Sequence, residues 1–118
     1  MMDILLSQAH KSMNGVVTDN GELAWTAQQT YEIMKLVEDK QWVVLGGDVL
    51  TRQFEYTCEN WFFQPNHYTT LAQNVDESIF RCCQYISNFV KKNGDGFLFL
   101  LTISDAFIHG GSQIPPRK

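Results

Sequence analysis

The chain has 118 residues, of which 44% are hydrophobic and 19% charged, so its composition is that of a globular protein and excludes a disordered one. Its three cysteines, Cys58, Cys82 and Cys83, are an odd number without CxxC spacing, which argues against a disulfide framework and favours reduced thiols. The net charge of -4 lies mainly in the first half, which argues against a nucleic-acid partner, because phosphate binding needs clustered Lys and Arg.

The first 21 residues give the weakest structural signal. Residues 3–13 fit either a short helix or an irregular arm, and Asn-Gly at 14–15 and Asp-Asn-Gly at 19–21 are typical of turns, with a short strand between them. This segment lacks the basic start and cleavage site of a signal peptide, and no run approaches the roughly 20 apolar residues of a membrane span. We therefore expect a cytoplasmic protein with no membrane segment.

A helix is predicted over about 26–39. Thr26 and Gln29 have the spacing of a capping box, in which each side chain bonds to the backbone of the other residue. Apolar residues then recur with helical period as far as Val37. Trp25, directly before the cap, is placed to act as a hydrophobic staple, a structural role that we favour over a binding role.

Two strands, about 42–50 and 54–63, are predicted next. Gly46 and Gly47 interrupt the first strand without ending its apolar pattern, which indicates a bulge or the close approach of another backbone. The second strand alternates with a period of two, so one set of residues is expected to face the core and the other to face solvent. The core set is Phe54, Tyr56 and Cys58, and the solvent set is Glu55, Thr57 and Glu59.

A second capping box, Thr70 with Gln73, predicts a long helix over about 70–92. The sequence Asn-Gly-Asp-Gly at 93–96 ends it, and the unbroken apolar run 97–103 is predicted to be a central or doubly covered strand. The tail, 104–118, contains glycines and prolines and is expected to be loose.

These elements predict one α+β domain over residues 1–118, a two-layer sandwich in which two helices cover a small, mainly antiparallel sheet. The uncovered face of the sheet is expected to be acidic. One buried cluster is expected to contain Trp42, Val44, Leu45, Ile79, Ile86, Leu98 and Leu100.

No motif in the chain specifies an enzyme, so we predict no catalytic residues, no cofactor and no metal site. The three histidines, His10, His67 and His109, lie in unrelated, loop-like contexts without ligand spacing. Cys58 is most simply a small buried hydrophobe. Asp48 and Glu59 could act as general acid and base in a cleft, but a solvated sheet face explains both residues more simply.

Four short features together carry a resemblance to a known family. They are Trp25 before a capped helix, the sequence VLGGDV at 44–49, the sequence ENWFF at 59–63, and the Tyr85-Ile86 pair late in the second helix. In this combination the chain resembles the immunity protein 40 family of bacterial polymorphic toxin systems, over roughly residues 25–89. The resemblance implies a cytoplasmic protein that binds and neutralises a cognate secreted or contact-delivered toxin.

An acidic protein suits the inhibition of a basic enzyme, and many nuclease toxins carry a positively charged substrate cleft. We therefore predict that Asp48, Glu55, Glu59 and Trp61 bind a toxin domain. One alternative is a ligand-binding or hydrolytic module that uses Asp48, Glu59 and Trp61 in a pocket on the sheet face. Another is an obligate homodimer joined through a sheet edge.

Overall fold

The structure is a computed structural model that describes residues 1–105. Its elements, in chain order, are α1 (Met2–Ser12), β1 (Val16–Val17), β2 (Leu23–Ala24), α2 (Ala27–Lys40), β3 (Val43–Leu50), β4 (Tyr56–Phe62), α3 (Leu71–Asn93) and β5 (Leu98–Ser104). The predicted helices and strands are confirmed with shifts of one or two residues. The N-terminal segment is a helix, and residues 106–118 of the predicted tail lie outside the described residues.

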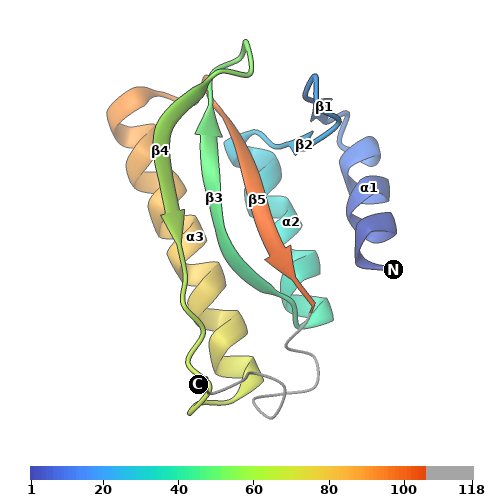
Figure 1. Cartoon of the computed structure of the whole chain (residues 1–118), viewed down its shortest axis with the longest axis vertical. Coiled ribbons are helices and arrows are strands. Elements are labelled where there is room, and N and C mark those ends of the chain that lie inside the picture. The colour runs from blue at the N-terminus through green and yellow to red at the C-terminus, as the bar shows by residue number, and fades with distance from the viewer. Residues whose placement is uncertain (106–118) are drawn as a thin grey trace.

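Residues 1–105 form two antiparallel sheets. β1 pairs with β2, and the larger sheet has the strand order β4-β3-β5, with β3 in the centre. α2 and α3 lie behind this sheet, and α1 with β1 and β2 lies beside β5 (Figure 1). The predicted α+β class is therefore confirmed. Among residues 1–105, no helix has the length and apolar character that crossing a membrane requires.

Both predicted capping boxes start the helices that they were expected to start. The Thr26 hydroxyl accepts a hydrogen bond from the Gln29 amide at 3.1 Å, and the Gln29 side chain accepts one from the Thr26 amide at 3.0 Å. Thr70 and Gln73 repeat this arrangement at α3. These bonds satisfy amides that the first helical turn leaves without partners, so the start of each helix is encoded locally.

The core consists of two clusters on opposite faces of the sheet, so the prediction of a single cluster is wrong. Trp42, Val44 and Ile86 belong to the larger cluster, between the sheet and the helices, with Ile79 half-buried against it. Leu98 and Leu100 belong to a smaller cluster on the opposite face, together with Leu50 and Ala24. Since Phe99 packs in the larger cluster, the first half of β5, Leu98–Leu100, is buried on both faces, as predicted for a doubly covered strand. β5 is not a central strand, because β3 lies in the centre of the sheet, and Thr102 in its second half is exposed. Leu45 is half-buried.

The faces of β4 are the reverse of those predicted. Tyr56 and Phe62 pair with Leu50 and Gly46 on the face away from the helices and are 58% and 72% exposed. Cys58 is also exposed, so its assignment as a buried hydrophobe is wrong. The odd-numbered residues face α3, because Trp61 is the residue of this strand that the main core buries. The uncovered face is therefore not the acidic surface that we expected.

Truncation of Ile86 to alanine tests the packing of α3 on the sheet. Ile86 is fully buried, so Ile86→Ala should lower the free energy of unfolding by about 2 to 5 kcal/mol in a urea titration. Phe80→Ala on the outer face of the same helix is the control, because Phe80 is 62% exposed, and it should cost less than about 0.5 kcal/mol. Equal costs for the two variants would contradict the packing of this helix.

Candidate partner-binding surface

The structure brings the two most specific motifs of the sequence into register on neighbouring strands. Gly46 lies opposite Phe62, Gly47 opposite Trp61, and Asp48 opposite Asn60. Directly opposed residues in an antiparallel pair share one face of the sheet. The Gly-Gly-Asp and Asn-Trp-Phe sequences are therefore one structural unit at the junction of β3 and β4.

Both glycines are required by what lies against them. Gly46 has φ +149°, and a Cβ added there would overlap the Trp61 carbonyl oxygen and lie 2.8 Å from the Phe62 Cα. A Cβ at Gly47 would lie 2.5 Å from the Trp61 Cη2 and would overlap the Leu100 carbonyl oxygen. The predicted bulge or close approach is confirmed, because the pairing of β3 with β5 also shifts register between Val44 and Gly46.

Trp61 lies between β3 and α3 and is only 8% exposed. Its ring stacks on the Tyr85 ring, with centroids 4.7 Å apart and an interplanar angle of 23°. The indole Nε1 is buried and has no hydrogen-bond partner among residues 1–105. This indole belongs to the core, and the aromatic side chain that β4 exposes here is Phe62.

Glu59 lies beside Tyr85, at the outer margin of the contact between β4 and α3. The Tyr85 hydroxyl donates a hydrogen bond to a Glu59 carboxylate oxygen at 3.1 Å. Partial burial raises the pKa of Tyr85 to about 12, and the hydrogen bond and negative charge of Glu59 add to the effect. The hydroxyl is protonated at neutral pH and donates this hydrogen bond to the exposed carboxylate.

The four residues predicted to bind a partner do not form one patch. Glu59 and Trp61 face α3, whereas Asp48 is half-exposed on the opposite face of the sheet, in the row that also contains Asn60 and Leu100. Glu55 is exposed in the turn before β4. Because Asp48 and Glu59 point to opposite faces, they cannot act together as acid and base. The geometry does not support the alternative of a pocket made by Asp48, Glu59 and Trp61.

Among residues 1–105, the cysteines and histidines form no recognisable reactive group. Burial raises the pKa of the Cys82 and Cys83 thiols, which disfavours the reactive thiolate. His10 lies in α1 and is buried, contrary to the loop-like context expected, and its Nε2 is 3.0 Å from the Ala24 carbonyl oxygen. Within residues 1–105, no three His, Cys, Asp or Glu side chains come together as metal ligands. His109 lies outside the described residues.

A groove runs between β4 and α3 at the outer margin of the sheet. Its middle part has a volume of about 480 Å³ and is lined by residues 60–64 on one side and by Arg81 and Tyr85 on the other. A hollow of about 280 Å³ adjoins it at Tyr85 and contains Glu59 and Lys92. A third, of about 540 Å³, adjoins it at Phe63 and Gln64 and extends to Asp76 and Glu77.

Sequence reasoning did not identify this groove. One wall of the groove comes from α3. The helical period of the sequence does not say which strand lies beside that face of the helix. The sequence feature that could have indicated this groove is the Tyr85-Ile86 pair, because a tyrosine beside a buried isoleucine lies at the border of the helix's apolar stripe.

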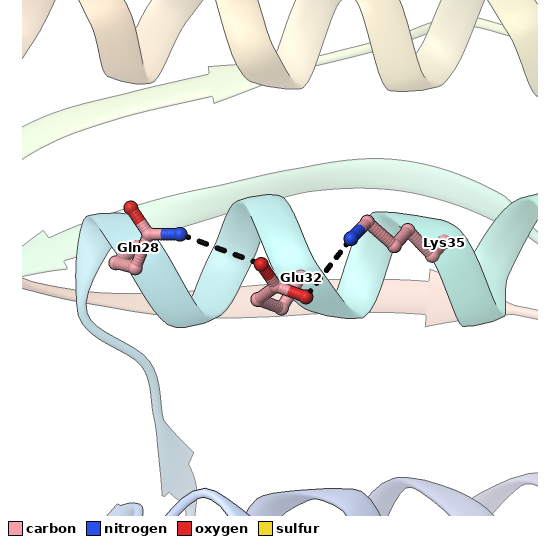
Figure 2. A network of polar contacts seen from close by, with 3 residues as sticks. All are labelled: Gln28, Glu32 and Lys35. Carbon is pink, nitrogen blue, oxygen red and sulfur yellow. Dashed lines mark hydrogen bonds and ion pairs between the residues drawn. The ribbon is translucent and has the colours of Figure 1, made fainter.

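Glu32 on α2 differs from the acids near the groove, because its carboxylate already has side-chain partners on the same helix. Glu32 accepts hydrogen bonds from Lys35 at 3.1 Å and from Gln28 at 3.4 Å, all on one exposed face of α2 (Figure 2). Part of the acceptor capacity of this carboxylate is therefore already used within α2. Glu55 and Glu59 are exposed acids without an ion pair to a described Lys or Arg.

Comparison with known protein families gives a match. The family model described as immunity protein 40 matches residues 12–103, which is more than half of the chain and includes the paired motifs of β3 and β4. No curated protein and no solved structure matches the chain.

Proposed function

The chain belongs to the immunity protein 40 family, and from this membership we propose that it binds and neutralises a cognate bacterial toxin by direct protein–protein contact. The observation that carries the proposal is the family match over residues 12–103. The toxin would be secreted or delivered by cell contact, and the protein would meet it in the cytoplasm of the cell that it protects.

We further propose that the toxin is a basic, nuclease-type domain. The chain has a net charge of -4 and a sequence pI of about 5.2. An acidic inhibitor attracts an enzyme whose cleft is positively charged for a nucleic-acid substrate, and this attraction speeds association. The exposed carboxylates of Glu55 and Glu59 are available for this role at the β4 margin.

The neighbouring genes provide the first test. A reading frame immediately upstream should encode a large protein with a variable C-terminal domain. Expression of that domain alone should arrest bacterial growth, and co-expression of this chain should restore it. Growth arrest that persists in the presence of the folded chain would contradict the pairing.

Charge reversal tests which acids attract the toxin. Glu55→Lys combined with Glu59→Lys should slow association with the purified toxin domain about tenfold at low ionic strength, because exposed charges steer encounter. The difference should shrink at high ionic strength, where salt screens these charges. Surface plasmon resonance at two salt concentrations measures both effects, and circular dichroism checks the fold.

Asp19→Lys combined with Glu22→Lys is the matched control. It makes the same change in net charge at two exposed positions in the turn between β1 and β2, on the other side of the sheet from β4 (Figure 1). Equal slowing in both double variants would mean that only net charge matters. Unchanged association after reversal of Glu55 and Glu59 would mean that other acids attract the toxin, with Asp39, Asp76 and Glu77 of the helices as the next candidates.

A further inference from the structure

The two margins of the main sheet differ in how they are covered. At the β5 margin, the Trp25 amide donates to the Phe99 carbonyl at 2.9 Å, and the Phe99 amide donates to the Trp25 carbonyl at 2.7 Å. At the β4 margin, no strand within residues 1–105 pairs with the outer edge (Figure 1). An edge strand with unpaired amides and carbonyls is a template for another strand, and proteins normally cover or blunt it.

The direction of the edge groups follows from one hydrogen bond. The Phe63 amide donates to the Leu45 carbonyl of the central strand at 2.8 Å. Since backbone groups alternate along a strand, the Trp61 amide also points toward β3, whereas the amides and carbonyls of Asn60 and Phe62 point outward. These outward groups can pair only with something outside the described sheet.

The first half of β4 is unsuitable for such pairing. Cys58 has φ +71°, and the Glu59 amide bonds to the Thr57 hydroxyl. The register with β3 also shifts between Asp48 and Leu50. A bulge of this kind bends the strand and interrupts its ladder. The regular part of the outer edge therefore extends from Asn60 to Phe62.

The groove described above follows this regular edge. Arg81 and Tyr85 of α3 form its wall beneath residues 60–64. A strand added to β4 would lie along the groove, and a side chain on its opposite face would lie beside the Phe62 ring, which is 72% exposed. One end of the groove carries Glu59 together with Lys92, and the other end carries Asp76 and Glu77. Arg81 is the charged residue of the middle part, so among these residues the acids outnumber the bases.

We propose that the toxin docks by adding an extended, positively charged segment to the outer edge of β4 at Asn60 and Phe62, with basic side chains toward Glu59 and the Asp76-Glu77 pair. This inference rests on the proposed function. A basic segment fits better than a second copy of this chain. Each copy carries a net charge of -4, so two copies would place like-charged acids opposite one another at the interface. Backbone pairing supplies affinity, and the groove supplies specificity.

Phe62→Pro removes the outward amide, and Phe62→Ala removes the ring but keeps the amide. Proline is tolerated on an edge strand where its missing N–H faces outward, so both variants should fold, as circular dichroism checks. With the purified toxin domain as probe, Phe62→Pro should bind about tenfold more weakly than Phe62→Ala, since loss of one donor also leaves its acceptor unpaired. Equal affinities would overturn strand addition.

Hydrogen exchange of the unmodified protein provides an independent measurement. The Phe62 amide should exchange fast in the free protein and slowly in the complex, whereas the Trp61 amide should be slow in both. A complex in which the Phe62 amide stays fast would overturn this inference and leave the proposed function intact. Failure to form any complex would instead overturn the proposed function. Protection of Phe62 that increases with the concentration of the free protein would identify a second copy as the occupant and would also overturn the inference.

Discussion

Gly46→Ala should destabilise the protein by about 4 kcal/mol. Gly46 has φ +149°, where a non-glycine residue is strained by about 1 to 3 kcal/mol. The added Cβ would also overlap the Trp61 carbonyl oxygen and crowd the Phe62 Cα, and forced overpacking costs about 1 to 3 kcal/mol more. Because both neighbours are backbone atoms of β4, relief requires that strand to move away from β3.

Gly96→Ala is the matched control for this measurement. No atom lies within 4 Å of a Cβ added at Gly96, so the same substitution there should change the free energy of unfolding by less than about 0.5 kcal/mol. Urea titration followed by circular dichroism measures both variants. A Gly46→Ala cost below about 1 kcal/mol would contradict the close approach of β3 and β4.

Trp61→Ala should cost about 3 to 5 kcal/mol, because it removes a large buried ring from between Gly47 and Tyr85. Trp61→Phe should cost clearly less. A phenylalanine ring keeps part of the stacking on Tyr85 and removes the buried Nε1 donor, which has no partner in the described part of the chain. The difference between the two variants, measured by urea titration, isolates the contribution of the stacked ring.

Tyr85→Phe is the control for the neighbouring hydrogen bond. It removes only the hydroxyl that donates to the exposed Glu59, so it should cost less than about 1 kcal/mol. If Trp61→Ala proved equally mild, Trp61 would not be the residue that fixes β4 on the core. The assignment of Glu59 and Trp61 to the helix side of the sheet would then need revision.

The Gly-Gly-Asp and Asn-Trp-Phe sequences contain residues that stabilise the fold, and beside them lie residues that are proposed to bind the toxin. The two groups can be tested separately. Gly46, Gly47 and Trp61 hold β4 against β3, so their substitution should reduce stability first. Phe62 and Glu59 project from the unit that these residues build, so their substitution should change binding with little effect on folding. A loss of toxin binding is interpretable only for the second group.

Local chemistry made several features readable from the sequence. Thr26 and Thr70 mark the helix starts because each capping box is closed by residues three positions apart. Gly46 and Gly47 marked a close approach because only glycine leaves space for another backbone. The apolar run of β5 indicated burial on both faces, which the structure has for Leu98–Leu100.

Only the tertiary structure decided which face of β4 is buried. A period of two separates Glu59 and Trp61 from Tyr56 and Phe62, but it does not say which set meets the core. Burial of the Trp61 ring against α3 settles the choice, and Glu59 then lies beside Tyr85 instead of beside Asp48. The edge at Asn60 and Phe62 that no strand of residues 1–105 covers also depends on long-range pairing, because β3 is paired on both sides and β4 is the outermost strand of the described sheet.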